Sequence, residues 1–219
     1  MAETVLQLKD VKYSYTKGGF VTVCNDLKLC RGDAVLLCGP NGSGKTTLGK
    51  LLCGILRPQQ GSLFVRGENA NGKSLGWIGK SVGYLFQDPA RQLFATTVWE
   101  EMIFIDDIKG VDPALTRERA LSLLSRFRIQ HLTDRSTYRL SRGEKQRLAM
   151  CTILMQGATQ LILDEPSTGL DNENRATLRA VIDELITGGA GVLIITHDNE
   201  LIRRYGAQLL RMEHGEVLC

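Results

Sequence analysis

The sequence predicts an α/β fold in which a core of parallel strands carries a helical insertion. Short apolar runs at residues 34–39, 161–166 and 192–198 are typical of buried strands. Helical patterns stand between these runs, and strands that alternate with helices favour a parallel sheet. Residues from about 88 to 140 differ, because they are charged and mostly helical. We expect this stretch to form a subdomain inserted into the core.

The remaining elements follow from local periodicity. Residues 5–15 alternate apolar and polar side chains, which indicates a half-exposed strand. We expect further strands at residues 20–30, 61–68 and 81–86, and a closing hairpin in residues 207–219 around His214 and Gly215. The predicted helices at residues 45–56 and 172–187 each have one apolar face, formed by Leu48, Leu51, Leu52 and Ile55 and by Leu178, Val181, Ile182 and Leu185. A third helix spans residues 112–127, with Asp112 as its N-cap and Pro113 in its first turn.

Length and composition limit the classes of protein. The 219 residues suit one domain with an insertion, and we expect a single domain over residues 1–219. A net charge of +3 is too small to argue for a nucleic-acid partner. No apolar run approaches the roughly 18–20 residues that span a bilayer. The first ten residues contain acids and no apolar block, so they do not form a secretory signal. These features predict a cytosolic chain whose membrane role would depend on a partner.

The cysteines give no sign of a metal site or a disulfide framework. None forms a Cys-x-x-Cys pair, and none has a histidine at metal-site spacing. Most have apolar neighbours, so we expect small reduced core residues. The six are Cys24, Cys30, Cys38, Cys53, Cys151 and Cys219.

Residues 39–46, GPNGSGKT, match the phosphate-binding pattern G-x-x-x-x-G-K-[ST] in full. The stretch follows a predicted buried strand and opens a predicted helix, which is the context that the pattern requires. Glycines let several backbone N–H groups point at one phosphate chain, and a helix N-terminus favours an anion. Lys45 can reach the β- and γ-phosphates, and the Thr46 hydroxyl can bind Mg²⁺. The alternative is a glycine-rich turn without a ligand.

We therefore predict that the chain binds ATP and Mg²⁺. The residues expected to contact the nucleotide in this loop are Gly39, Pro40, Asn41, Gly42, Ser43, Gly44, Lys45, Thr46 and Thr47.

Polar residues at the ends of other predicted strands supply the rest of the site. Asp164 and Glu165 end one apolar run, at the carboxyl end of a strand, where ligand sites of open α/β sheets lie. Asp164 suits a role around Mg²⁺, and Glu165 can polarise the attacking water as a general base. His197 can hydrogen-bond the γ-phosphate, and Gln87 can contact both Mg²⁺ and water. The alternatives are a solvated acidic pair and a structural histidine.

The motifs occur in the order and approximate spacing of an ATP-binding-cassette (ABC) ATPase, and the chain resembles that family over essentially its whole length. They are the phosphate loop, Gln87, residues 140–144 (LSRGE), residues 161–165 (LILDE), residues 167–171 (STGLD) and His197. The resemblance implies a P-loop NTPase core, an antiparallel β subdomain and an inserted helical subdomain. It also implies that Tyr15 stacks on adenine, a role for which Tyr13 is a competitor.

The resemblance further implies a dimer. In this family two nucleotide-binding domains pack head to tail, and each ATP lies between the phosphate loop of one chain and a Leu-Ser-Gly-Gly-Gln segment of the other. Ser141 and the Gly143 N–H would face the γ-phosphate of the partner's ATP, and Asp171 would link the two sites. Arg142 and Glu144 depart from the usual glycine and glutamine. Ser141 and Gly143 are retained, so we expect activity to survive.

Residues 86–104, FQDPARQLFATTVWEEMIF, resemble the ATPases of energy-coupling-factor importers and of related cobalt and nickel importers. In cassette transporters a groove in this region receives short helices of the membrane partner. Leu93, Phe94 and Trp99 would supply apolar contacts, and Glu100 and Glu101 would lie at the rim for cationic partner residues. The alternative is that Phe94 and Trp99 are ordinary core aromatics.

The resemblance thus implies an ATPase subunit that energises the import of a vitamin or a transition-metal ion. The expected partners are a second nucleotide-binding domain, identical or different, a transmembrane scaffold and a substrate-capture membrane subunit, with no nucleic acid. The chain would lie at the cytoplasmic face of the membrane. The alternatives are a subunit of a conventional ABC importer or exporter and a soluble ABC ATPase outside transport.

Overall fold

The computed structural model describes residues 3–218, which form two compact units. The sheet unit consists of the chain up to Tyr84, Ala158–Glu165 and the chain from Ile182 onward. The helical unit consists of Leu85–Gly157 and Pro166–Val181, so it extends beyond the stretch from about 88 to 140.

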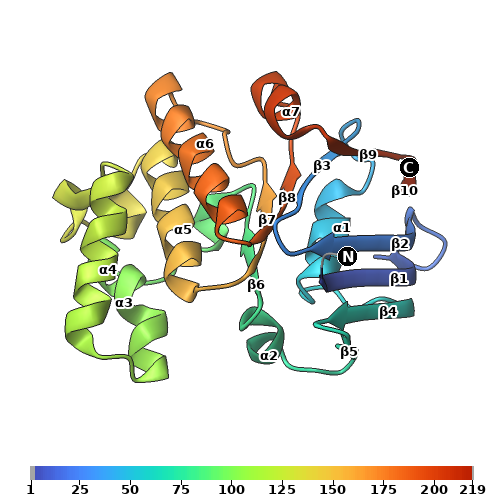
Figure 1. Ribbon diagram of the computed structural model, residues 1–219, viewed down its shortest axis with the longest axis horizontal. Coiled ribbons are helices and arrows are strands. Elements are labelled where there is room, and N and C mark those ends of the chain that lie inside the picture. The colour runs from blue at the N-terminus through green and yellow to red at the C-terminus, as the bar shows by residue number, and fades with distance from the viewer. Residues whose placement is uncertain (1–2, 219) are drawn as a thin grey trace. The chain divides into compact units, whose positions relative to one another are not determined.

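The sheet unit is built on one sheet of ten strands in the order β5-β4-β1-β2-β10-β9-β3-β8-β7-β6 (Figure 1). The strands are β1 (Thr4–Ser14), β2 (Val21–Cys30), β3 (Ala34–Cys38), β4 (Gln60–Val65), β5 (Glu68–Asn69), β6 (Val82–Leu85), β7 (Gln160–Asp164), β8 (Gly191–Ile195), β9 (Gln208–Glu213) and β10 (Glu216–Leu218). All strands predicted from the sequence are present, with ends shifted by one or two residues at most sites.

The three apolar runs form neighbouring parallel strands, as predicted. β3 pairs with β8 from Ala34 opposite Val192, and β7 pairs with β8 from Gln160 opposite Gly191. Every residue of β7 and β8 is buried. Because parallel strands align their carboxyl ends, Cys38, Asp164 and Ile195 finish at the same edge of the sheet, and the loops that follow them can share one site.

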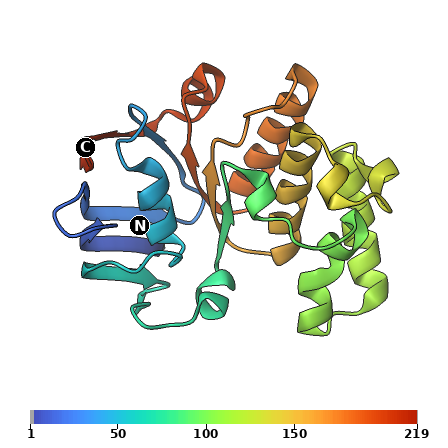
Figure 2. The same ribbon diagram turned by 180° about the vertical axis from the view of Figure 1, so that it is seen from behind.

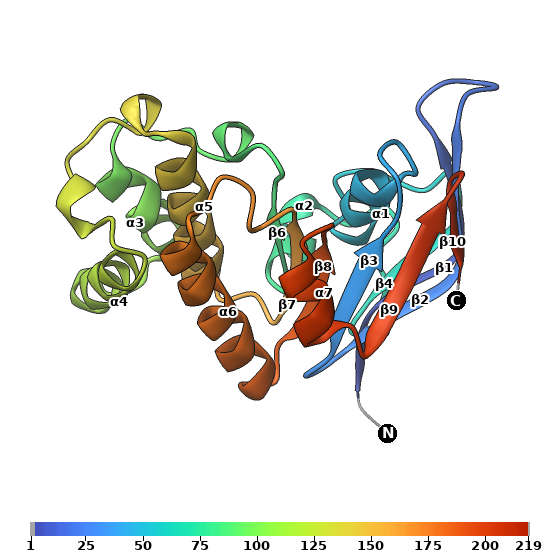
Figure 3. The same ribbon diagram turned by 90° about the horizontal axis from the view of Figure 1, so that it is seen from above.

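The other half of the sheet is mostly antiparallel, with one parallel pair between β2 and β10, which matches the β subdomain that the family resemblance implies. β1 pairs with both β2 and β4, and β9 pairs with β10 in the predicted hairpin around His214 and Gly215 (Figure 3, blue, teal and red strands). The register between β1 and β4 shifts after Lys9. Gly61 permits this irregularity, because a Cβ there would lie 2.3 Å from the Asp10 carbonyl oxygen.

The helices of the sheet unit are α1 (Lys45–Leu52), α2 (Leu75–Gly79) and α7 (Asn199–Tyr205). The predicted helix at 45–56 is too long at its C-terminal end. Gly54 has a φ of 72°, which ends the helix, and Ile55 is 38% exposed beyond it instead of completing the apolar face. The short helix α2, which the sequence did not reveal, is capped by the Ser74 side chain.

The helical unit contains α3 (Val98–Lys109), α4 (Pro113–Arg126) and α5 (Arg142–Gln156) with short 3₁₀ turns at Pro89–Arg91, Gln130–Leu132 and Thr137–Arg139 (Figure 2, green to orange). α4 matches its prediction, including the cap, since the Asp112 carboxylate accepts a hydrogen bond from the Ala114 N–H. The buried interior of the unit includes Met102, Leu124 and Leu148.

The helix α6 (Asn172–Thr187) has the predicted bounds and belongs in part to each unit. Leu178, Val181 and Ile182 are buried as expected, whereas Leu185 is only half-buried.

None of the five described cysteines forms a disulfide; Cys24, Cys53 and Cys151 are buried, and Cys30 and Cys38 are half-buried. Cys219 lies outside the described residues. Among residues 3–218, no helix combines the length and the apolar character needed to cross a membrane.

Candidate nucleotide site

The phosphate loop connects β3 to α1 and has a backbone that only glycine fits at two positions. A Cβ on Gly39 would lie 2.0 Å from the Met212 carbonyl oxygen, and a Cβ on Gly44 would lie 2.7 Å from the end of the Met212 side chain. Their φ values are 152° and 105°. The glycines of the motif are therefore required by the fold as well as by the predicted ligand.

The loop also provides positive charge and free donors. The Lys45 side chain curls back, so that its ammonium donates to the carbonyls of Gly39 at 2.8 Å and Pro40 at 2.9 Å. No side chain caps the N-terminus of α1, and its first turn contains no acid. Its first N–H groups thus keep the capacity to bind an anion, which the helix dipole favours.

Asp164 lies at the carboxyl end of β7 and is fully buried. It accepts a hydrogen bond from the Tyr84 hydroxyl at 2.9 Å. Burial raises the pKa of Asp164, and a hydrogen bond with the Thr46 side chain opposes that rise. The two residues predicted to act around Mg²⁺ in this unit are therefore in contact. A hydroxyl and a carboxylate oxygen side by side fit a hard cation such as Mg²⁺.

Glu165 follows Asp164 in a strained backbone conformation, with a φ of 52°. Its N–H is bonded to the Ile195 carbonyl at 2.8 Å, and the residue is 6% exposed. Burial, together with the negative charge of Asp164, raises the pKa of Glu165 to about 7, while the charge of Lys45 opposes the rise. A carboxyl with a pKa near neutrality can exchange a proton at physiological pH, as a general base requires.

His197 lies beside Glu165. Its Nε2 is 2.9 Å from Glu165 Oε1, close enough for an ion pair when the imidazole is protonated. This contact lacks the geometry of a hydrogen bond. Within the described chain, Glu165 Oε1 has no hydrogen-bond partner. The structure thus brings together five of the predicted residues, namely Lys45, Thr46, Asp164, Glu165 and His197.

An aromatic cluster stands next to the start of α1. Tyr15 is exposed, its ring meets that of Tyr13 edge-on at 5.1 Å, and its hydroxyl accepts a hydrogen bond from Thr47 at 3.5 Å. Phe20 is also exposed and lies beside the loop, since a Cβ on Gly44 would be 3.4 Å from its ring. Sequence reasoning missed Phe20, because a Phe at the start of a strand carries no distinguishing pattern. The role of Tyr15 remains a prediction.

Sequence reasoning also missed Tyr84, whose hydroxyl contacts Asp164. Its place near the end of a predicted strand, three residues before Gln87, was the available signal. Gln87 itself belongs to the helical unit and is exposed. Its predicted contact with the residues of the sheet unit remains a prediction.

In the helical unit, Ser141 is the N-cap of α5. Its Oγ accepts a hydrogen bond from the Glu144 N–H at 3.3 Å, and the Glu144 carboxylate accepts one from the Ser141 N–H at 2.6 Å. This reciprocal capping box gives Glu144 a role in the fold, because a carboxylate is well suited to cap a helix N-terminus. The backbone bond to Ser141 lowers the pKa of Glu144, which keeps the side chain charged.

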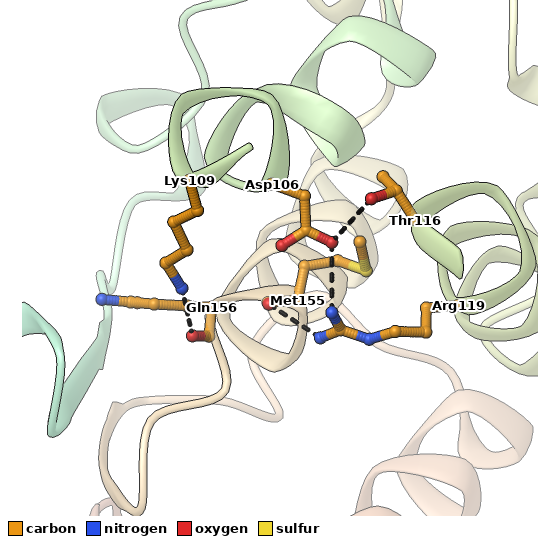
Figure 4. Close-up of polar contacts among 6 residues, drawn as sticks. All are labelled: Asp106, Lys109, Thr116, Arg119, Met155 and Gln156. Atoms are coloured by element: carbon orange, nitrogen blue, oxygen red, sulfur yellow. Dashed lines mark hydrogen bonds and ion pairs between the residues drawn. The ribbon is translucent and has the colours of Figure 1, made fainter. Parts of the chain in front are cut away.

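The opposite end of α5 is also fixed (Figure 4). Arg119 of α4 donates to the Met155 carbonyl at 2.9 Å and to the Asp106 carboxylate of α3 at 3.1 Å. Lys109 of α3 donates to the Gln156 carbonyl at 3.0 Å. Two cations thus satisfy carbonyls that a helix C-terminus leaves without partners.

Asp171 lies at the start of α6 and is held locally. Its carboxylate accepts hydrogen bonds from the backbone N–H and the side-chain amide of Asn174, each at 2.8 Å. The backbone bond is the main reason why the pKa of Asp171 is lowered. Its predicted role between two sites is not visible in one chain and remains a prediction.

The segment 86–104 corrects one expectation. Glu101 does not lie at a surface rim: it is 5% exposed and accepts hydrogen bonds from the backbone N–H groups of Phe94 at 2.9 Å and Ala95 at 2.7 Å. Two free N–H groups in the preceding loop need an acceptor, and Glu101 supplies it. Burial raises the pKa of Glu101, whereas the two hydrogen bonds act to lower it. Glu100 is exposed and forms the capping box of α3 with Thr97.

The aromatics of this segment differ from one another. Phe94 is exposed and packs edge-on against Phe104 at 4.6 Å, so it is not an ordinary core residue. Trp99 is half-buried and lies 5.5 Å from the Arg117 guanidinium. Phe94, Phe104 and the exposed Ile108 form what we call the α3 apolar patch.

Comparison with known proteins assigns the family. The family described as ABC transporter matches residues 25–168, more than half of the chain. EcfA of Methanothermobacter thermautotrophicus, an energy-coupling factor transporter ATP-binding protein, is 34% identical over 217 residues, which are 98% of this chain and 70% of the relative. The chain covers only 38% of an ABC transporter ATP-binding protein from Caldanaerobacter subterraneus, which is 33% identical.

Solved structures of ATP-binding cassettes support the same family assignment. The cbiO1 protein of Clostridium perfringens, described as part of the ABC transporter complex cbiONQ, matches with a TM-score of 0.82 and 29% identity over 99% of this chain and 88% of that one. A dimeric ATP-binding cassette in a post-hydrolysis state, bound to ADP and Pi, matches with a TM-score of 0.86 and 25% identity over 98% and 97%. The chain therefore belongs to the ABC transporter family and is an ATP-binding, ATP-hydrolysing cassette similar to EcfA and cbiO1.

Proposed function

We propose that this cassette energises a membrane importer of the energy-coupling-factor type, which takes up a vitamin or a transition-metal ion. The observation that carries the proposal is the likeness over nearly the whole chain to EcfA, named for an energy-coupling factor transporter, and to cbiO1. Residues 86–104 support the same subtype.

In the proposed reaction the loop from Gly39 to Thr47 holds the phosphates of ATP, and Tyr15 stacks on adenine. Thr46, Asp164 and Gln87 would hold Mg²⁺, which would neutralise phosphate charge. Glu165 accepts a proton from the attacking water, and its pKa of about 7 suits this task. His197 and Lys45 stabilise the charge that develops on the γ-phosphate.

We further infer that the active unit is a head-to-tail dimer, of two identical or two different cassettes. The dimeric cassette with ADP and Pi supports this arrangement. So does the exposed N-terminus of α5, where Ser141 and Gly143 would reach the partner's ATP while the capping box holds the helix start.

The α3 apolar patch supports a membrane partner. Phe104 and Ile108 are four residues apart on α3, so they share one face of the helix, and Phe94 extends that face. A short amphipathic helix of a transmembrane scaffold fits such a surface. The cassette would then lie at the cytoplasmic side of the membrane, and a substrate-capture subunit would complete the importer.

Co-expression with a scaffold and a substrate-capture subunit tests the proposal. We expect the scaffold to raise ATP turnover of the wild-type cassette, and Phe104→Glu to abolish that stimulation while it leaves the turnover of the isolated cassette intact. Leu115→Glu is the control, because Leu115 is exposed on α4, outside the patch. Recovery with a periplasmic-type binding system instead of a capture subunit would contradict the subtype, and equal effects of the two variants would contradict the docking surface.

A further inference from the structure

The segment Pro166–Asp171 rests on the first turn of α5, and the two meet through glycines. A Cβ on Gly143 would lie 2.9 Å from the Gly169 carbonyl oxygen. Gly169 has a φ of 78°, a conformation that other residues rarely adopt. The two backbones are therefore in contact with no side chain between them. A displacement of the segment would change the backbone contact at Gly143 directly.

Arg142 covers this contact. A Cβ on Gly169 would lie 3.7 Å from both Cγ and Cδ of Arg142 and 3.9 Å from its Nε. The stem of the side chain thus lies over Gly169, while the residue as a whole is exposed. Within residues 3–218 its guanidinium has no hydrogen-bonded or ion-paired partner. A cation in the first turn of a helix is also disfavoured by the helix dipole. The fold therefore gains from the aliphatic stem and not from the charge.

The helix that carries Arg142 is a firm support for the segment. The capping box between Ser141 and Glu144 closes its first turn, and the network around Arg119 closes its last turn (Figure 4). Between these ends, the buried Gln146 donates from Nε2 to the Pro166 carbonyl at 3.3 Å. Arg175 of α6 also holds the segment, since it donates from Nε to the Leu170 carbonyl at 3.1 Å.

We propose that Arg142 is a positioning residue whose aliphatic stem holds Gly169, and with it the segment Pro166–Asp171, against the start of α5. Other side chains bind the segment at Pro166, Leu170 and Asp171. Arg142 packs over Gly169, between these points. The glycine usual at this position in the family has no stem with which to do this. The arginine is therefore an added clamp in this chain.

The consequence for catalysis rests on the proposed dimer. Asp171 would link the two nucleotide sites, and Gly143 would contact the partner's ATP, so the clamp joins the two parts of one chain that face its partner. A loosened segment would lower turnover without weakening the binding of ATP to the phosphate loop of the same chain.

Hydrogen exchange of the full chain without nucleotide tests the clamp. Arg142→Ala removes the stem and keeps a strong helix former, Arg142→Met keeps the stem without the charge, and Arg142→Lys keeps both a stem and a charge. We expect the amides of residues 167–171 to exchange about three- to tenfold faster in the alanine variant and at the wild-type rate in the methionine and lysine variants. Wild-type exchange in the alanine variant, or alanine-like exchange in the methionine variant, would overturn the proposal.

Steady-state ATP turnover provides a second measurement, which would not change if Arg142 only stabilised the fold. The alanine variant should lose about three- to tenfold in kcat with KM for ATP unchanged, and methionine should restore kcat. Rescue by lysine but not by methionine would show that the charge acts, and would overturn the clamp. If the wild-type chain forms no dimer with ATP, the proposed function fails, whereas the exchange experiment still decides the role of Arg142.

Discussion

Glu165 Oε1 lies 2.9 Å from His197 Nε2, at the edge of the sheet where β7 and β8 end. The predicted general base and the predicted phosphate contact are thus neighbours, although 31 residues separate them in the chain. The φ of 52° at Glu165 and its raised pKa show that this arrangement has an energetic cost in the folded protein.

Replacing Glu165 by glutamine should therefore stabilise the fold at neutral and alkaline pH. A carboxyl whose pKa rises from 4.5 to about 7 on folding favours the folded state when protonated, and this advantage disappears as the pH rises through about 7. Above that pH, Glu165→Gln should raise the free energy of unfolding by at most about 3 kcal/mol relative to the wild type, and near pH 4.5 by close to nothing.

Urea unfolding at several pH values measures the difference. Glu216→Gln, on the exposed strand β10, is the control and should show no such trend. If the difference between Glu165→Gln and wild type does not grow with pH, burial and the charge of Asp164 do not raise the pKa of Glu165.

The two capping boxes offer a matched pair of substitutions. Ser141→Ala at the start of α5 and Thr97→Ala at the start of α3 each remove a cap from a helix in the same unit. Each should lower the free energy of unfolding by about 1 kcal/mol. Only Ser141→Ala should also lower ATP turnover, by at least about tenfold, because only that hydroxyl would meet a nucleotide. Equal turnover in the two variants would leave Ser141 with a capping role alone.

The buried carboxylate of Asp106 predicts a large stability effect. Its side chain is 1% exposed, and Arg119 is the cation that pairs with it. Arg119→Met removes the paired cation and leaves the carboxylate with a hydrogen bond from the Thr116 hydroxyl. It should cost about 2–3 kcal/mol, less than for a fully buried pair because Arg119 is itself partly exposed. Arg117→Met on the same helix removes only a contact with Trp99 and should cost less than about 1 kcal/mol.

Adding Asp106→Asn to Arg119→Met should recover part of the loss, since the uncompensated charge is then gone. Similar unfolding curves for Arg119→Met and Arg117→Met would show that the network of Figure 4 carries little of the stability of the helical unit.

These residues also show how far the sequence could predict the structure. The phosphate loop, Asp164, Glu165 and His197 could be placed because each follows a short apolar strand, and parallel strands end at one edge of the sheet. The end of α1 was misjudged because the apolar period continues to Ile55 while Gly54 stops the helix. Glu101 was misplaced because a carboxylate on an amphipathic segment is usually solvated, and nothing local reveals the two N–H groups that it binds. The contact between Gly143 and Gly169 joins glycines 26 residues apart, for which a single sequence contains no signal.

Mixing two inactive variants tests the proposed dimer most directly. Lys45→Ala disables the phosphate loop, and Ser141→Arg disables the segment that would serve the partner, so neither variant alone should hydrolyse ATP. In a mixed head-to-tail dimer, the intact phosphate loop of one chain meets the intact Ser141 of the other. An equal mixture should therefore regain about a quarter of the wild-type turnover per chain, because half of the randomly formed dimers are mixed and each has one intact site. If the wild-type chain alone hydrolyses ATP and the mixture stays as inactive as its components, Ser141 does not act on the partner's nucleotide, and the head-to-tail dimer is wrong.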